Sequence, residues 1–108
     1  MPLNKLTNIG AFAGLEFCTF KMKPGASEEQ LIAAAIAAED EFLSKEAGFL
    51  GHGILKDGNG LYVDITFATS QVKAQEICAK WTSNDFAVKY LEFIDGDTVN
   101  MSFWERIK

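Results

Sequence analysis

The most constraining feature of this sequence is a predicted β-hairpin between Phe49 and Phe67. Its second half has the period-2 alternation of a strand with one apolar face. The apolar positions are Leu61, Val63, Ile65 and Phe67, and the polar ones are Tyr62, Asp64 and Thr66. Residues 57–60, Asp-Gly-Asn-Gly, separate the two halves, and such residues tolerate the positive φ of tight turns. The hairpin therefore predicts part of an antiparallel sheet.

The register of this hairpin decides which way the only histidine, His52, points. A two-residue turn at 58–59 pairs His52 with Ile65 and Ile54 with Val63. On that register His52 shares the apolar face of the hairpin. A slip of one residue would move every side chain of the strand to the other face.

The segments around the hairpin complete an α+β pattern. The first helix is predicted to begin after Ser27, which stands three residues before Gln30 in the spacing of a capping box. The other expected elements are a strand over 15–23, the end of that first helix near 45, a broken helical segment over about 70–94, and a last strand over about 98–107. The order strand, helix, strand, strand, helix, strand predicts a ferredoxin-like βαββαβ sandwich.

Length and charge limit the classes of function. The 108 residues predict one folded domain over 15–108, preceded by an N-terminal arm over 1–14. Lys and Arg number 10 against 15 Asp and Glu, a net charge of −5 that argues against nucleic-acid and anionic-membrane partners. No export signal or membrane span is recognised, and two separated cysteines favour reduced thiols, so a cytoplasmic protein is expected.

The predicted topology leaves one face of the sheet without helices. Both crossovers are right-handed, so both helical segments lie on the same side. The open face is expected to carry Leu55, Tyr62 and Trp104 with four polar residues, Asp64, Thr66, Asn100 and Ser102. A surface this aromatic is typical of an interface, so a homodimer is predicted. A monomer whose N-terminal arm covers the sheet is the alternative.

Three segments together resemble the dimeric α/β-barrel superfamily, and within it the antibiotic-biosynthesis-monooxygenase-like domains. They are TFKMKPGASEEQLIAAAIAAEDEFLSKEAGFLGHGILKD, GLYVDITFATS and WTSNDFAVKYLEFID, and the likeness spans roughly residues 15–107. The resemblance implies that two sheets close a barrel across a dimer axis, with a ligand pocket between each sheet and its own helices. It implies a pocket lined by His52, Ile54, Val63, Ile65 and Phe67, with Trp81, Phe86 and Tyr90 above them.

Departures from that family limit the chemistry that the resemblance implies. Haem-degrading members carry Trp and His where this sequence has Phe67 and Tyr90, so haem is not expected. Quinone-forming members without cofactors use an arginine, and the only one here is Arg106 near the C-terminus. One histidine and two distant cysteines are no zinc set, and no glycine-rich loop leads from a strand into a helix. No cofactor and no metal are expected.

We therefore expect the pocket to bind a small aromatic or polyketide-like molecule. Monooxygenase-like action on that molecule, without a cofactor, is the enzymatic version of this expectation. The expected catalytic residues are His52 and Tyr90, because a histidine enclosed by apolar side chains has a pKa below its ordinary value and can exchange a proton near pH 7. The expected ligand-binding residues are Ile54, Val63, Ile65, Phe67, Trp81 and Phe86. A non-catalytic binding or sensing module, a ligand-free dimer and a His52 that is only a hydrogen-bonded core residue remain alternatives.

Overall fold

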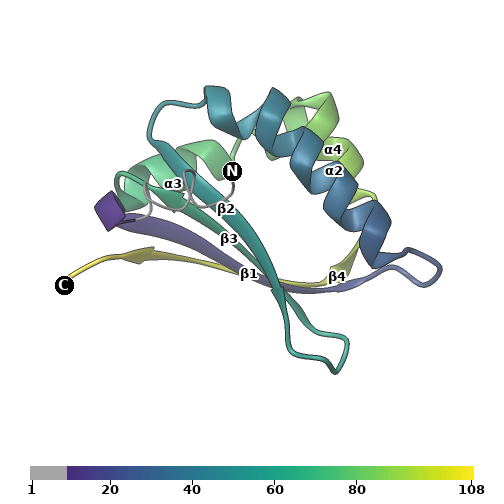
Figure 1. Cartoon of the computed structure of the whole chain (residues 1–108). Helices are drawn as coiled ribbons and strands as arrows, with labels where there is room; N and C mark the ends of the chain where they lie inside the picture. Colours follow the sequence, from purple (N-terminus) through teal and green to yellow (C-terminus); the bar gives the residue numbers. More distant parts are fainter. Residues whose placement is uncertain (1–9) are drawn as a thin grey trace.

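A computed structural model describes residues 10–108, which form a four-stranded antiparallel sheet with all helices on one face (Figure 1). In chain order the elements are β1 (Gly14–Met22), α2 (Glu28–Glu41), the 3-10 helix η2 (Leu43–Lys45), β2 (Phe49–Lys56), β3 (Tyr62–Ala68), α3 (Gln71–Cys78), the 3-10 helix η3 (Trp81–Ser83), α4 (Asp85–Leu91) and β4 (Ile94–Glu105). The strand order β2-β3-β1-β4 is that of the ferredoxin-like fold, so the predicted fold class is confirmed. Most of the expected arm, residues 1–9, lies outside the described residues.

Side-chain caps determine where the helices begin. The predicted capping box is present: Ser27 Oγ accepts from the backbone N–H of Gln30 at 3.1 Å, and Gln30 Oε1 accepts from the N–H of Ser27 at 3.0 Å. Ser70 caps α3. Asn84 Oδ1 accepts from two backbone N–H groups and starts α4 anew after the break at η3. This second cap turns the chain back over the sheet and so positions Tyr90.

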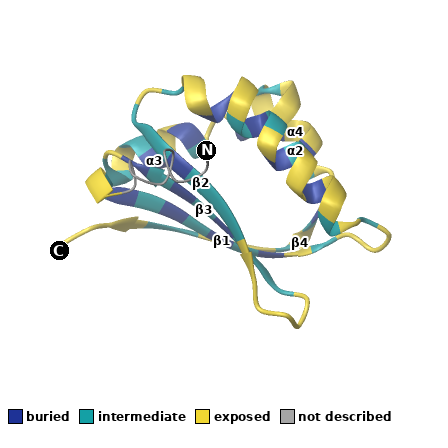
Figure 2. Ribbon diagram, viewed as in Figure 1, coloured by how far each residue is buried: buried dark blue, intermediate teal, exposed yellow. Residues whose placement is uncertain are grey.

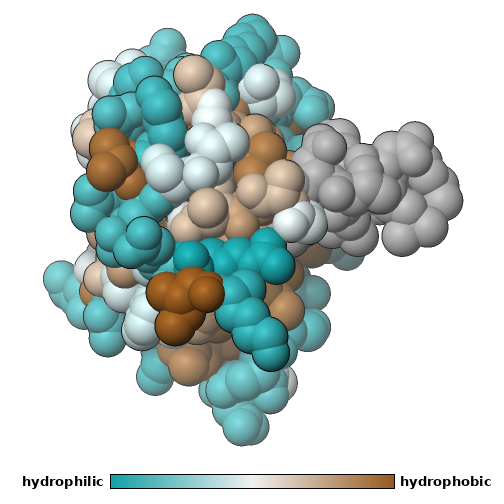
Figure 3. Space-filling view, turned by 90° about the vertical axis from the view of Figure 1, so that its left-hand side faces the viewer, coloured by the Kyte–Doolittle hydropathy of each residue, from teal (hydrophilic) through white to brown (hydrophobic). Residues whose placement is uncertain are grey.

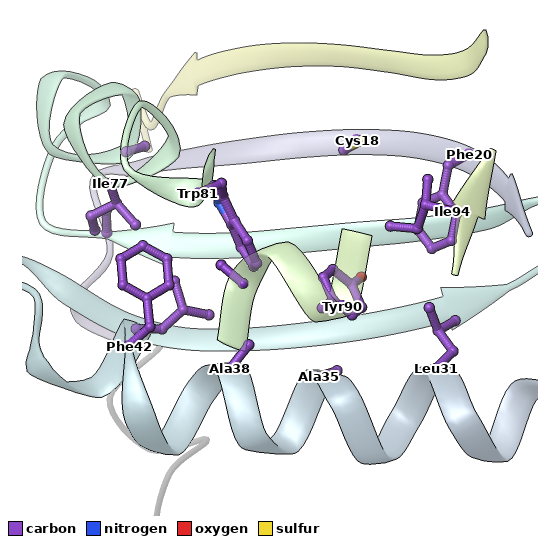
Figure 4. Packing of buried hydrophobic residues seen from close by; sticks show 14 residues of the cluster. Cys18, Phe20, Leu31, Ala35, Ala38, Phe42, Ile77, Trp81, Tyr90 and Ile94 are labelled. Atoms are coloured by element: carbon purple, nitrogen blue, oxygen red, sulfur yellow. The ribbon is translucent and has the colours of Figure 1, made fainter. Parts of the chain in front are cut away.

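The core lies between the sheet and the helices. Figure 2 shows buried and partly exposed residues alternating along the strands, while the outward helix surfaces are exposed. On α2 the buried positions are Leu31, Ala35 and Ala38, and the small alanines let this helix approach its neighbours closely. In the close-up of Figure 4, Trp81 and Tyr90 project from η3 and α4 into the space between sheet and α2.

The turn of the hairpin is longer than the two-residue turn that the sequence predicted. Asp57 Oδ1 accepts from the backbone N–H groups of Asn59 at 2.7 Å and Leu61 at 3.2 Å. The backbone N–H of Asp57 also donates to the carbonyl of Leu61 at 3.1 Å. The aspartate side chain therefore organises a five-residue connection over 57–61, a turn chemistry that the glycine pattern alone did not reveal.

This longer turn shifts the strand register by one residue. His52 lies opposite Thr66 and Ile54 opposite Asp64, whereas the prediction paired them with Ile65 and Val63. The side chains of β3 that face the helices are consequently those of Tyr62, Asp64 and Thr66, which the prediction had assigned to the open face. His52 does lie beneath the helices, but its neighbours there are polar.

The last strand starts four residues earlier than predicted. Ile94 and Asp95 pair with Met22 and Lys21, and the register shifts between Thr19 and Lys21. The hydroxyl of Thr98 bridges this irregularity, since it accepts from the N–H of Lys21 at 2.8 Å and donates to the carbonyl of Asp95 at 2.7 Å. The Asp-Gly-Asp sequence at 95–97 is thus a bulge within β4 rather than a loop before it.

The open face of the sheet carries a set of apolar side chains beside the polar Thr19, Asn100 and Ser102. Its apolar side chains are Leu15, Phe17, Leu55, Val63, Ile65, Phe67 and Trp104. Leu55 and Trp104 are 54% and 57% exposed. Phe12 packs at one end of this face, with its ring 5.1 Å from that of Phe67. The end of the molecule that faces the viewer in Figure 3 instead mixes hydrophilic and hydrophobic groups. The homodimer stays a prediction.

Within residues 10–108, no helix is both long and apolar enough to cross a membrane. The cytoplasmic location stays a prediction.

Candidate functional site

Four polar side chains lie buried beneath the helices on three neighbouring strands. Strand pairing places Thr66 of β3 between His52 of β2 and Glu16 of β1. Asp64 lies two residues before Thr66 on the same face of β3. The exposed fractions of Glu16, Asp64 and Thr66 are only 3%, 4% and 1%. Charged groups are rarely this buried without a role in binding, catalysis or pairing, so the cluster is the candidate site.

Asp64 is the centre of the hydrogen bonding in this cluster. Its Oδ2 lies 2.9 Å from His52 Nε2 and accepts from the hydroxyl of Tyr90 at 2.5 Å. Its other oxygen, Oδ1, is buried and has no hydrogen-bond partner in the described part of the chain. One oxygen of Asp64 is therefore fixed by the protein, and the other is enclosed without a partner among the described residues.

The carboxylate of Asp64 sets the protonation of both of its partners. Burial disfavours the imidazolium of His52, but the charge of Asp64 and its hydrogen bond outweigh burial and raise the pKa of His52 above 6.5. The predicted lowering of this pKa is wrong, because the shifted register puts a carboxylate beside the ring. Burial and the charge of Asp64 also raise the pKa of Tyr90, which stays a protonated donor.

Glu16 is the residue of the candidate site that sequence reasoning missed. Burial, and after it the negative charge of Asp64, raise the pKa of Glu16 from 4.5 to about 7. Its Oε1 lacks a partner within hydrogen-bond distance among the described residues, and its Oε2 receives a weak contact from Cys78 Sγ at 3.8 Å. The neighbouring hydroxyl of Thr66 and the Cys78 thiol both act to lower the pKa of Glu16, but burial outweighs them. The sequence did hold a signal for it: in β1, Glu16 alternates in step with Cys18 and Phe20, so all three side chains lie on the same face of the strand.

A cavity of about 180 Å³ adjoins both carboxylates, between the sheet and the η3–α4 segment. Its lining consists of Glu16, Cys18, Phe20, Asp64, Cys78, Trp81, Thr82, Tyr90, Leu91, Ile94, Val99 and Met101. An apolar protein cavity of roughly 150 Å³ holds benzene. The volume therefore suits one aromatic ring, which would lie against Trp81 and Tyr90 (Figure 4).

A second opening lies on the other side of His52. It is a groove of about 270 Å³ between α2 and β2, lined by Ile32, Ala35, Ile36, Glu39, His52, Gly53 and Ile54. Asp64 lines the cavity and His52 lines the groove, so their hydrogen bond links the two spaces.

The residues predicted to line one pocket are distributed over several places. Trp81 and Tyr90 line the cavity, and His52 and Ile54 line the groove beside it. Phe86 is 43% exposed and borders an outer groove between α2 and α4. The predicted pocket positions of Val63, Ile65 and Phe67 are wrong, because the shifted register turns these side chains to the open face of the sheet.

The two cysteines of the cavity wall are not activated nucleophiles. Burial, followed by the charges of the nearby carboxylates, raises the pKa of Cys18 and of Cys78 to about 12. Both are therefore thiols at neutral pH. No group of three or more His, Cys, Asp or Glu side chains in residues 10–108 is arranged to hold a metal ion.

Comparison with known proteins finds relatives by structure alone. No protein-family model matches the chain, and no curated protein matches it in sequence. The cofactor-independent oxygenase SnoaB from Streptomyces nogalater is 16% identical at a TM-score of 0.63, with 89% of this chain and 95% of that chain covered. A predicted antibiotic biosynthesis monooxygenase from Chloroflexus aurantiacus is 13% identical at 0.60, covering 88% and 93%.

A NIPSNAP family protein of unknown function from Agrobacterium tumefaciens is similar as well, at 16% identity and a TM-score of 0.57, with 89% of each chain covered. Identities this low establish a shared fold and carry no activity across. This chain therefore has the ferredoxin-like α+β fold that these solved structures share.

Proposed function

We propose that this protein binds a one-ring aromatic molecule with an acidic hydroxyl in the cavity beside Glu16 and Asp64, and oxygenates it without a cofactor. The observation that carries the proposal is the pair of buried carboxylates, each with an unpartnered oxygen, on the wall of an apolar cavity of about 180 Å³. Such a site combines an apolar enclosure with a few convergent polar groups, as small-molecule sites do. The likeness to a cofactor-independent oxygenase in fold supports the same class of chemistry.

The cavity supplies a suitable proton acceptor. A general base works best when its pKa lies near the working pH, and that of Glu16 is about 7. In the proposed first step, Glu16 takes the proton of the substrate hydroxyl and leaves an electron-rich phenolate against Trp81. Asp64, held by His52 and Tyr90, fixes the geometry of the same sheet wall beside Glu16.

The oxygen chemistry that follows is carried by the substrate and dioxygen. For a phenol with a free para position, the phenolate reduces O₂, one oxygen atom forms a carbonyl at the para carbon, and the other leaves as water. Phenol plus O₂ then gives benzoquinone plus H₂O. The substrate loses four electrons to O₂, and its hydroxyl hydrogen and the hydrogen of the para carbon end up in the water molecule. The residues contribute binding, orientation and the transfer of the hydroxyl proton.

We also propose that the protein is a homodimer through the open face of its sheet. The apolar side chains of that face, with Leu55 and Trp104 more than half exposed, form a surface of the kind that marks protein interfaces. A second copy of this chain, related by a two-fold axis, would cover Leu55 and Trp104 in a contact that is the same on both protomers.

Oxygen uptake tests the enzymatic proposal. The wild type, Glu16→Gln and Glu29→Gln are each supplied with single-ring phenols and with two- to four-ring phenols in an oxygen electrode, and products are identified by mass spectrometry. We expect uptake with single rings, a loss of about 100-fold or more for Glu16→Gln, and wild-type rates for the control Glu29→Gln, because Glu29 is exposed on the first turn of α2. Binding without oxygen uptake would make the protein a non-catalytic binding module, and absence of binding would refute both versions.

A further inference from the structure

We propose that Met101 determines which ligands enter the cavity, because its side chain lies across the entrance and restricts it to single-ring phenols. This inference rests on the proposed function, since it concerns the same cavity, and it adds a specificity-determining residue to that function. A shorter side chain at position 101 should therefore admit a two-ring phenol that the wild type excludes.

The burial of the lining residues locates the entrance. Most of the lining is buried, including Cys18 and Asp64. Val99 and Met101 of β4 also line the cavity, yet their exposed fractions are 38% and 41%. Thr82 of η3, which lines the cavity from the side of the helices, is exposed as well. The cavity therefore opens to solvent between β4 and the η3–α4 segment.

Strand pairing puts Met101 at the outer end of a row of side chains that leads inward to Asp64. Met101 of β4 pairs with Cys18 of β1, and Cys18 pairs with Asp64 of β3. Directly paired residues project from the same face of a sheet, and all three residues line the cavity. Because β4 is at the edge of the sheet, a ligand that enters there passes Met101 before it reaches the inner wall.

The side chain of Met101 reaches from the edge strand to the helices. The thiol of Cys78, the last residue of α3, donates a weak hydrogen bond to Met101 Sδ at 3.2 Å. Burial raises the pKa of this thiol to about 12, so it keeps its proton at neutral pH. The contact joins β4 to the helices at the opening and holds the methionine across it.

Met101 is also the part of the rim that can move. A methionine is unbranched and has three rotatable side-chain bonds, so its end can swing aside once the weak contact with Cys78 is broken. Val99, the other exposed residue of β4 at the opening, is branched at Cβ and stiffer. Ligand entry should therefore depend on the side chain at position 101.

The size of the cavity explains why the rim selects ligands. Its volume of about 180 Å³ suits one aromatic ring. A fused second ring would have to extend outward through the opening, into the space that Met101 occupies. Alanine at position 101 would leave this space free, and differences in size of this kind change the affinity of a pocket by about tenfold or more.

NMR titration of ¹⁵N-labelled protein with p-cresol and with 2-naphthol measures the effect. The indole N–H of Trp81, which lines the cavity, reports affinity through its shift and exchange rates through its line shape. The proteins are the wild type, Met101→Ala, Met101→Phe and a control, Val72→Ala. Val72 is an exposed apolar residue of α3 that is not part of the cavity lining.

The two substitutions at position 101 should act in opposite directions. Met101→Ala should bind 2-naphthol at least about ten times more tightly than the wild type does. Met101→Phe, with a larger and stiffer side chain, should lower the association rate of p-cresol by about tenfold. Val72→Ala should behave as the wild type with both phenols. If one of the two variants does not fold, the other still decides the question.

The outcomes that overturn this inference differ from failure of the proposed function. If the wild type binds 2-naphthol as tightly as Met101→Ala does, Met101 does not select by size, although the aromatic site stands. If p-cresol shifts Trp81 but neither substitution changes affinities or rates, the entrance lies elsewhere. If neither phenol shifts Trp81 in any of the four proteins, the cavity is not a ligand site, and the proposed function fails together with the inference.

Discussion

Replacing Glu16 with glutamine should stabilise this protein, and by an amount that depends on pH. The substitution keeps the size of the side chain and removes its charge. A glutamine amide can also donate to the hydroxyl oxygen of Thr66, which faces Glu16 across the strands and has no partner among the described residues. The buried carboxylate is the costly form, and the variant cannot adopt it.

The magnitude follows from the pKa of Glu16, which is 4.5 as an unperturbed group and about 7 in the folded protein. Because folding raises this pKa, the neutral side chain contributes its full stability below pH 4.5, and that stability is lost as the pH rises through 7. A shift from 4.5 to about 7 corresponds to about 3 kcal/mol. His52, whose pKa is also raised, loses its contribution to stability in the same direction at high pH. The charge of Glu16 is the smallest of the causes that raise the pKa of His52, so the substitution changes this contribution only slightly.

Urea unfolding of wild type and Glu16→Gln at equal protein concentration, at several pH values from 4 to 8, measures the difference in free energy of unfolding. We expect the two proteins to match near pH 4 and the variant to be about 3 kcal/mol more stable at pH 8, with most of the gain between pH 5 and 7. A difference that does not change with pH would show that Glu16 is not held as a buried acid.

Other substitutions probe the remaining features. Tyr90→Phe removes a donor from the buried carboxylate and should lower the free energy of unfolding by about 1 to 3 kcal/mol. Tyr62→Phe removes a hydroxyl that bonds Glu28 near the surface and should lower it much less, so equal effects of the two variants in urea unfolding would argue against the buried network. Trp104→Glu should reduce the mass measured by light scattering from that of two chains to that of one chain, 11.9 kDa, whereas Ile36→Glu, on the exposed surface of α2, should leave the mass unchanged. A wild-type mass of 11.9 kDa at all concentrations would refute the dimer. Gly14→Ala should cost about 3 kcal/mol, because its Cβ would meet the backbone at the start of α3 at 2.1 Å, and a stable variant would contradict that packing.

The fold could be predicted because its signals are local. Alternation in β3, the capping box at Ser27 and Gln30, and the break that Asn84 recaps all depend on residues close in sequence. The elements they define leave few topologies for a chain of 108 residues. The start of β4 was the exception, because the hydroxyl of Thr98 draws the Asp-Gly-Asp segment into the sheet.

The site was predictable only in part, because it depends on one residue of register. The side chain of Asp57 lengthens the hairpin turn, and this exchanges the faces of β3. Asp64 consequently lies beside His52, where the sequence pattern had placed an apolar neighbour. The pKa shift of Glu16 could not be read from the sequence at all, because it arises from burial and from a carboxylate 48 positions away along the chain.

The most direct test of the account is whether an aromatic molecule enters the cavity beside Glu16 and Asp64. Two indole N–H resonances of ¹⁵N-labelled protein report on it, since Trp81 lines the cavity and Trp104 lies on the open face of the sheet. Titration with p-cresol should shift the resonance of Trp81 in a saturable way and leave that of Trp104 in place. A Trp81 resonance that stays unmoved up to the solubility limit of p-cresol, or a shift confined to Trp104, would contradict the proposed site.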